Sequence, residues 1–421
     1  MNFPTLSEKI KNKNARVGII GMGYVGLPLA ILAASKGYAV TGLVRTTTKA
    51  QQLQKGSSSV DTIDKSELLE VLSNKKLIPT VLSSKELKNQ DIIIICVPTP
   101  ITHAKKPDLT SMKSVAKELG KANLTDCLVI NESSVAPGTT RELFDNISTF
   151  LACSPERVDP GNHDKNVANI AKIVGGIDSQ SLVLAQRFYK QILSANIVGV
   201  SNLETAEMAK MLENTYRAVN ISLINEIALL CERIGIDVLE VIRAASTKWS
   251  FQAHYPGIGV GGHCIPVDPY YLLELAKINN TPMTVTRAAL ERNNDMPQSL
   301  YEKLRRVYKK GMSIVVYGIT YKKDIADLRE SPVLEFCSIL EHNSIPFDVY
   351  DPLLSKSQIS TLGLRVAKYA HVDIFVVGTD HSQLDNDQKF FISKSTIVID
   401  GRNAFIKKVG LRVIGVGRMR S

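Results

Sequence analysis

The sequence predicts an α/β protein in which two Rossmann-like, doubly wound domains are joined by a central helical domain that contains one long helix. Three observations support this prediction. Short apolar runs alternate with helical patterns from Arg16 onward, one helical segment covers residues 203–234, and strand–helix alternation resumes after Gly311. A chain of 421 residues exceeds what one hydrophobic core usually supports. The expected domains are residues 1–202, 203–300 and 301–421.

The apolar runs at both ends of the chain are continuous rather than alternating, which is typical of parallel strands buried on both faces. In the first domain these runs are residues 16–20, 39–44, 91–97, 127–131, 172–175 and 196–200, with a strand-like segment at 150–153. In the last domain they are residues 313–319, 347–350, 373–378 and 396–400. Strands that alternate with helices in this way predict a doubly wound sheet at each end.

The helical segment from residue 203 to 234 contains neither Gly nor Pro and is followed by Gly235, which is a typical stop signal. A helix of this size would be about 45 Å long at 1.5 Å per residue. That length exceeds the needs of one small domain. We therefore expect the helix to bridge domains or to form an interface in a homodimer or higher homo-oligomer.

The formal net charge of +10 is compatible with nucleic acid, a membrane surface or small anionic ligands as partners. Lys and Arg are scattered, without an arginine-rich arm or a basic run interleaved with aromatic residues. Neither nucleic acid nor a membrane is therefore an expected partner, whereas a phosphate-bearing substrate fits the charge.

Six widely spaced cysteines form no CxxC pair, so neither a zinc ribbon nor a disulfide scaffold is expected, and no metal site is predicted. The first 13 residues are polar and charged, and no apolar run approaches 18 residues. The expected location is a reducing cytoplasm.

A GxGxxG motif stands between the first apolar run and a helical pattern. Its residues are Gly21, Met22, Gly23, Tyr24, Val25 and Gly26. In this context the first glycine permits a tight turn, the second lets backbone N–H groups approach a pyrophosphate, and the third lets helix and strand pack closely. The motif predicts a dinucleotide site.

The acidic residue that normally holds the ribose hydroxyls of NAD is missing after the second predicted strand, where the chain reads Val44-Arg45 followed by three threonines. Arg45 suits a ribose 2′-phosphate, so NADP is an alternative to NAD. An exposed arginine on a loop, with NAD still the cofactor, explains the sequence equally well.

Cys264 lies in an unusual setting, because four glycines occur in the seven residues before His263 and Asp268 follows it by four residues. Glycines let a backbone crowd a ligand, and a cysteine held there becomes a nucleophile when a nearby cation lowers its pKa. The other five cysteines are interpreted as small buried hydrophobic residues.

Two further candidates have weaker sequence support. Lys210 and Asn214 are four residues apart on the long helix and share one face, although a helical lysine is usually a solvated surface residue. Glu156 follows a strand-like segment at the edge where α/β domains bind ligands. It is either a base or a loop carboxylate paired with Arg157.

Six ordered motifs resemble those of the UDP-glucose/GDP-mannose dehydrogenase family over nearly the whole chain. They are GMGYVGLP at residues 21–28, VPTP at 97–100, SPER at 154–157, Lys210 to Asn214, GGHC at 261–264, and YKKD with RESP between residues 321 and 332. The resemblance implies an NAD(P)-binding first domain, a central domain for dimerisation that carries the catalytic Lys and Cys, and a UDP-sugar-binding last domain.

The resemblance also implies a four-electron oxidation of a sugar C6 alcohol to a carboxylate with two NAD(P)+ reduced. Cys264 would capture the aldehyde as a thiohemiacetal and then form a thioester. Lys210 and Asn214 would stabilise the oxyanion. Glu156 would activate water, which Asp268 would position.

Other roles are assigned by the same resemblance. Ser134, where the family more often has Thr, would bind the hydrolytic water. Predicted cofactor contacts are the six motif residues, Arg45, Pro98, Thr99 and Arg329. Predicted substrate contacts are Arg157, Lys210, Asn214, Lys248, Tyr255, Gly261, Lys322 and Lys323.

Within the family, His263 before Cys264 and the segment 154–162 are most similar to the UDP-N-acetylhexosamine branch. UDP-N-acetylglucosamine is the first expected substrate, with UDP-N-acetylmannosamine and UDP-glucose as alternatives. A dinucleotide-binding protein that has lost catalysis is a more remote alternative.

Overall fold

The computed structural model describes residues 3–58, 60, 63–102, 104–147, 150–158, 166–405 and 410–418. The chain divides into two compact units, each of which is described by itself. The first comprises Met1–Glu213 with Tyr270–Asn279, and the second comprises Asn214–Pro269 with Asn280–Ser421. The expected three-domain division stays a prediction. Within the described ranges, no helix is both long enough and apolar enough to cross a bilayer.

The first unit is built on one eight-stranded sheet with the order β3-β2-β1-β4-β5-β6-β7-β8. Its first six strands have the 3-2-1-4-5-6 order of a Rossmann fold. All neighbouring strands are parallel except β6 and β7, which are antiparallel. The strands are β1 Arg16–Ile20, β2 Ala39–Val44, β3 Leu77–Val81, β4 Ile92–Ile95, β5 Leu128–Asn131, β6 Phe150–Cys153, β7 Lys172–Gly176 and β8 Ile197–Val200.

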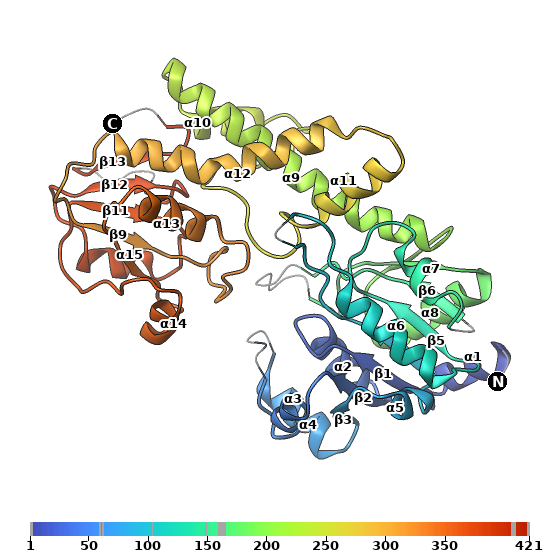
Figure 1. The fold of residues 1–421 in the computed structure, drawn as a ribbon. Helices are drawn as coiled ribbons and strands as arrows, with labels where there is room; N and C mark the ends of the chain where they lie inside the picture. Colours follow the sequence, from blue (N-terminus) through green and yellow to red (C-terminus); the bar gives the residue numbers. More distant parts are fainter. Residues whose placement is uncertain are drawn as a thin grey trace. The chain divides into compact units, whose positions relative to one another are not determined.

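Helices pack against this sheet (Figure 1). They are α1 Phe3–Lys11, α2 Gly26–Ser35, α3 Thr47–Gln54, α4 Lys65–Ser73, α5 Ser84–Lys88, α6 Thr110–Ala122, α7 Thr139–Phe144 and α8 Ser179–Ile192. The four isoleucines of β4 are fully buried, as expected for a central strand covered on both faces. The strand β3 was missed because Pro79 interrupts its pattern. It is an edge strand, where proline is tolerated.

The second unit carries a five-stranded parallel sheet with the order β10-β9-β11-β12-β13. Its strands are β9 Ile314–Tyr317, β10 Asp348–Tyr350, β11 Ile374–Val377, β12 Ile397–Asp400 and β13 Arg412–Gly415. Its other helices are α10 Val238–Ala245, α12 Thr284–Arg305, α13 Pro332–His342, α14 Lys356–Thr361, α15 Leu384–Asp387 and the 3₁₀ helix η1 Gln388–Phe390. The strand order reverses between β9 and β11, so the carboxyl ends of these strands are the expected ligand position.

Two helices contain the boundary between the units. Helix α9, Leu203–Ile234, is continuous as predicted and is followed by Gly235, whose φ of +75° suits glycine (Figure 1). Helix α11, Asp268–Ile278, begins in the second unit and continues in the first. The predicted fold class is confirmed.

Candidate active site

The glycine loop after β1 has the backbone conformation that the motif predicts. Gly21 has a φ of +95°, and a Cβ on Gly21 would lie 2.3 Å from the carbonyl oxygen of Cys96. A Cβ on Gly26 would lie 1.9 Å from the carbonyl oxygen of Gly21, so only glycine lets α2 start this close to the strand. A Cβ on Gly23 would meet nothing within 4 Å, which leaves open space where a pyrophosphate can approach the backbone. The loop therefore fits a dinucleotide.

Hydrogen bonds join the segments that follow β4 and β5. The Ser133 hydroxyl accepts a hydrogen bond from the backbone N–H of Val97 (3.0 Å), and Thr99 donates its hydroxyl proton to the carbonyl of Ser134 (2.7 Å). The Tyr271 hydroxyl of α11 donates to the carbonyl of Thr99 (3.0 Å). The predicted cofactor residue Thr99 and the predicted water-binding residue Ser134 are therefore brought together.

The predicted 2′-phosphate contact, Arg45, is exposed directly after β2. The side chain of the next residue, Thr46, caps α3 by accepting a hydrogen bond from Lys49 N–H (3.3 Å). One of the three threonines therefore has a structural role, and Arg45 remains the side chain able to meet a ribose phosphate.

A buried charge cluster lies at the carboxyl edge of this sheet, and its position follows from the antiparallel pairing of β6 and β7. Cys153 is paired with Gly175. Because the strands are antiparallel, continuing this register by three residues puts Glu156 opposite Lys172. Lys172 Nζ contacts Glu156 Oε2 (2.7 Å) and Glu132 Oε2 (2.8 Å). Tyr189 donates its hydroxyl proton to the other oxygen of Glu132.

Burial and charge together set the protonation of this cluster. Burial raises the pKa of Glu132 to about 7, although Lys172 opposes the shift. Burial would also raise the pKa of Glu156, but Lys172 and the backbone N–H groups of Arg157 and Val158 outweigh it and hold that pKa below its usual range. Burial alone would lower the pKa of Lys172, yet the two carboxylates raise it.

These contacts bear on the predicted role of Glu156. A carboxylate that accepts three hydrogen bonds, one of them from a buried ammonium group, is a weak base, and it anchors the loop after β6. Activation of water by Glu156 stays a prediction. Arg157 is held by Glu213 (2.6 Å) and by the carbonyl of Ala171 (2.8 Å), which limits its freedom to reach a substrate. Residues 159–162 of the same motif lie outside the described residues.

Helix α9 carries two of the predicted catalytic side chains. Near its start, the carboxylate of Glu207 accepts hydrogen bonds from the N–H groups of Gly138 (2.6 Å) and Thr140 (2.9 Å), which fixes the helix against the start of α7. Lys210 is buried one turn later. Asn214, after one more turn, donates a hydrogen bond from Nδ2 to Asp268 Oδ2 (2.5 Å).

The Cys264 turn lies directly before α11. The carbonyl of Cys264 accepts hydrogen bonds from the N–H groups of Val267 (3.0 Å) and Asp268 (2.8 Å). Cys264 is partly exposed, whereas the carboxylate of Asp268 is buried at the start of the helix. The second unit therefore brings together Cys264, Asp268 and Asn214, three predicted members of the catalytic set. Ser134, Glu156 and Lys210 belong to the first unit.

Two of the glycines before Cys264 have a packing role in addition to the role inferred from the sequence. A Cβ on Gly261 would lie 2.6 Å from the Tyr321 Cβ, and one on Gly262 would lie 2.7 Å from the Tyr321 ring. Gly259 and Gly262 also have φ values of +128° and +91°. The glycines therefore let the segment pack against its own domain, and crowding of a ligand is not needed to explain Gly261 and Gly262.

Two predicted substrate contacts, Lys322 and Lys323, and one predicted cofactor contact, Arg329, follow β9. Lys322 is partly exposed and Lys323 is exposed. Arg329 contacts the carboxylate of Asp327 through Nε (2.9 Å) and a terminal nitrogen (2.5 Å). Two other predicted substrate contacts, Lys248 and Tyr255, are exposed.

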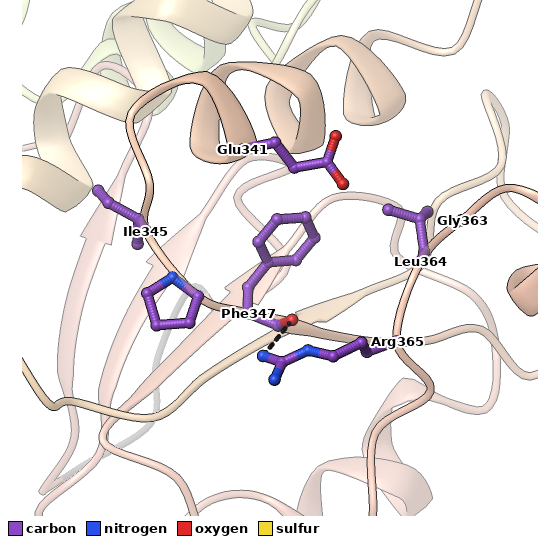
Figure 2. A pocket seen from close by; sticks show the side chains of 7 residues that line it. Glu341, Ile345, Phe347, Gly363, Leu364 and Arg365 are labelled. Atoms are coloured by element: carbon purple, nitrogen blue, oxygen red, sulfur yellow. Dashed lines mark hydrogen bonds between the residues drawn. The ribbon is translucent and has the colours of Figure 1, made fainter.

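A pocket of about 270 Å³ also lies in the second unit, where Glu341 of α13 projects near the Phe347 ring and Arg365 donates to the Phe347 carbonyl (3.0 Å) (Figure 2). Phe347 directly precedes β10, so the pocket is at the amino end of that strand. Ligands of doubly wound sheets bind at the carboxyl ends. This pocket is therefore not the expected nucleotide site.

Sequence reasoning missed three of the polar residues that the folded chain buries in these units: Glu132, Lys172 and His381. An available signal was an ionisable residue at the start of an otherwise apolar strand, as Lys172 is in β7. Its partners are 16 and 40 residues away in the chain, so the pairing was not visible from spacing.

The geometry defines a dinucleotide-binding α/β protein with a second nucleotide-binding-type domain. Models of the UDP-glucose/GDP-mannose dehydrogenase family match the chain in three parts: the NAD binding domain at residues 15–193, the central domain at 204–295 and the UDP binding domain at 315–407. The chain therefore belongs to the UDP-glucose/GDP-mannose dehydrogenase family and is an NAD-dependent UDP-sugar dehydrogenase of that family.

Named relatives are similar over nearly their full length. UDP-N-acetyl-D-mannosamine dehydrogenase of Pyrococcus horikoshii is 36% identical over 96% of this chain and 99% of the relative. UDP-N-acetyl-D-glucosamine 6-dehydrogenase of Pseudomonas aeruginosa is 33% identical over 89% and 92%. A solved structure of the P. horikoshii enzyme superposes with a TM-score of 0.85 at 33% identity and covers 96% of this chain and 99% of that one.

Proposed function

We propose that the chain is a UDP-N-acetylhexosamine 6-dehydrogenase that oxidises the C6 alcohol to a uronic acid through a thioester on Cys264. The observation that carries the proposal is the Cys264 turn, in which Asp268 and Asn214 are joined by a hydrogen bond beside a cysteine that solvent reaches. Relatives that bear N-acetylmannosamine and N-acetylglucosamine names both support the hexosamine class.

The reaction would consume one alcohol, one water and two NAD+, and it would release one carboxylate, two NADH and three protons. The glycine loop would hold NAD+, which would supply the hydride acceptor for both oxidations. Between them, the Cys264 thiolate adds to the aldehyde carbon and forms a C–S bond. Lys210 and Asn214 supply a positive charge and a hydrogen-bond donor to the oxyanion that results. Water then cleaves the C–S bond of the thioester and regenerates the thiol, and we expect Asp268 to position this water for proton transfer.

The proposal also has to specify the configuration of the substrate sugar at C2. UDP-N-acetylglucosamine was the first expectation from the sequence, whereas the P. horikoshii relative bears the N-acetylmannosamine name. The two sugars differ only in configuration at C2. We place UDP-N-acetylmannosamine beside UDP-N-acetylglucosamine as the pair to be compared, with UDP-glucose third.

The test is a steady-state assay of the three UDP-sugars, each with NAD+ and with NADP+, that counts reduced cofactor per acid formed. We expect two equivalents of NADH per uronic acid from one of the two N-acetylhexosamines. Faster turnover with NADP+ would assign Arg45 to the 2′-phosphate. One equivalent, with an aldehyde or ketone as product, would contradict the cysteine mechanism, and preference for UDP-glucose would contradict the hexosamine proposal.

A homodimer through α9 is the second part of the proposal. Apolar side chains remain exposed along this helix at intervals of four or seven residues, the spacing of a helix-packing seam. Those in the second unit are Tyr216, Leu223, Leu230 and Ile234. A second copy of the chain can bury such a stripe against its own, because a two-fold interface is self-complementary.

Replacing Leu223 by Glu is expected to shift the protein from dimer to monomer, since it places a charge in the centre of the stripe. Light scattering after size-exclusion chromatography measures the mass directly. The matched control is Leu362→Glu, because Leu362 is an exposed leucine beyond the end of α14. A Leu223→Glu protein of unchanged mass would contradict this interface.

A further inference from the structure

His381 is a buried histidine in the loop that follows β11, at the point where the strand order of the second unit reverses. Its Nδ1 atom lies 3.0 Å from the backbone nitrogen of Asp324. Its Nε2 atom lies 3.1 Å from the Thr320 hydroxyl and 3.4 Å from Asp351 Oδ2. The imidazole thus connects the loops that follow three strands, β9, β10 and β11.

The directions of these hydrogen bonds define the tautomer of His381. A backbone N–H can only donate, so Nδ1 accepts from Asp324 and the proton of the neutral ring is on Nε2. The Thr320 hydroxyl donates to the carbonyl of Lys322 (3.2 Å), which leaves its oxygen free to accept from Nε2. One neutral imidazole therefore satisfies both ends of the segment 320–324.

This segment needs such support because its last residue is strained. Asp324 has a φ of +57°. This backbone conformation is unfavourable in free energy for any residue that carries a Cβ. Its carboxylate accepts hydrogen bonds from the N–H (2.8 Å) and hydroxyl (2.5 Å) of Ser382, the residue after His381. The loops after β9 and β11 therefore hold each other in a single conformation.

Lys322 and Lys323 lie inside the supported segment, between Thr320 and Asp324. They are predicted substrate contacts, and the chain around them matches a UDP binding domain, so the diphosphate of the proposed UDP-sugar substrate is the ligand that suits these two cations. Two lysines bind a diphosphate more tightly when the loop that carries them is ordered before binding, because ordering a loop on binding costs free energy.

We propose that His381 is a positioning residue for the nucleotide diphosphate: its Nδ1 holds the loop 320–324 in the conformation that presents Lys322 and Lys323. This inference rests on the proposed function, because that function supplies the ligand. It predicts a role in UDP affinity and in KM for the UDP-sugar, without a role in the chemical step or in NAD+ binding.

The test compares two substitutions, each of which places an amide group near the position of one of the two ring nitrogens. His381→Asn places an amide oxygen near the position of Nδ1 and can still accept from Asp324, whereas His381→Gln reaches toward the Nε2 position and leaves that N–H without its acceptor. Isothermal titration with UDP measures the affinity of the intact protein. We expect His381→Gln to bind UDP about 10-fold more weakly than the wild type, with His381→Asn close to the wild type. The control is His342→Ala, because His342 is exposed at the end of α13.

Steady-state kinetics separate positioning from loss of fold. His381→Gln should raise KM for the UDP-sugar about 10-fold while kcat and KM for NAD+ stay within about two-fold of the wild type. Equal weakening by Asn and Gln, or a His381→Gln protein that binds UDP as the wild type does, would overturn the inference. A wild-type protein that does not bind UDP would instead overturn the proposed function.

Discussion

Replacing Cys264 by Ala is expected to lower the rate of uronic acid formation by about 10³-fold or more. Without the thiol, no thiohemiacetal forms and the second oxidation has no covalent intermediate to act on. Serine at this position should also stall before acid release, because its hydroxyl is a much weaker nucleophile than a thiolate. The measurement is acid released and NADH formed in the same reaction, since the aldehyde stage is separated from the acid only when both are counted.

The matched control is Cys231→Ala, because Cys231 is buried on α9 in the core of the second unit. This variant should lose about 1 kcal/mol of stability and keep its kcat. An ordinary one-step dehydrogenase needs no cysteine nucleophile, so normal turnover by Cys264→Ala would refute the proposed mechanism. UDP binding by the variant shows that the fold is intact.

Replacing Lys172 by Met should destabilise the first unit by about 3–5 kcal/mol, because it leaves Glu132 and Glu156 buried without the cation between them. The corresponding fall in the unfolding midpoint is about 10 °C. Thermal denaturation followed by circular dichroism measures it. The control is Lys190→Met, an exposed lysine on α8 that should change the midpoint by at most a degree or two.

The deficit of the Lys172→Met protein should shrink as the pH falls from 8 to 5. The pKa of Glu132 is raised from its ordinary value of 4.5 to about 7 in the folded state. A raised carboxyl pKa stabilises the fold fully below the ordinary value, and this contribution is lost as the pH rises through about 7. Loss of Lys172 strengthens this dependence. A deficit that grew toward pH 5 would contradict the assignment of the buried charges.

The fold was predictable because its main signals are local. The glycine loop, the apolar runs and the helix from Leu203 to Ile234 each follow from neighbouring residues. The two missed strands, β3 and β13, are edge strands, where weaker burial leaves a weaker apolar pattern. The antiparallel pairing of β6 and β7 was not predicted either, since strand direction depends on how the chain returns to the sheet.

The site was only partly predictable from the sequence. Cys264 and the pair Lys210 and Asn214 are recognisable from their motifs. The hydrogen bond from Asn214 to Asp268 joins residues 54 positions apart, and His381 contacts Asp324 from 57 positions away. Such pairings depend on which strand ends meet at one edge of a sheet.

The sequence by itself determined the fold class and the family and singled out Cys264 as the candidate nucleophile, because these depend on short patterns and their order along the chain. The tertiary structure decided which charged side chains form ion pairs and which ionisable groups carry a proton. It placed Lys172 between two carboxylates because β7 is antiparallel to β6. It also showed that close packing against Tyr321 requires glycine at positions 261 and 262. Burial and distance set the pKa of a carboxyl group, and both exist only once the chain has folded.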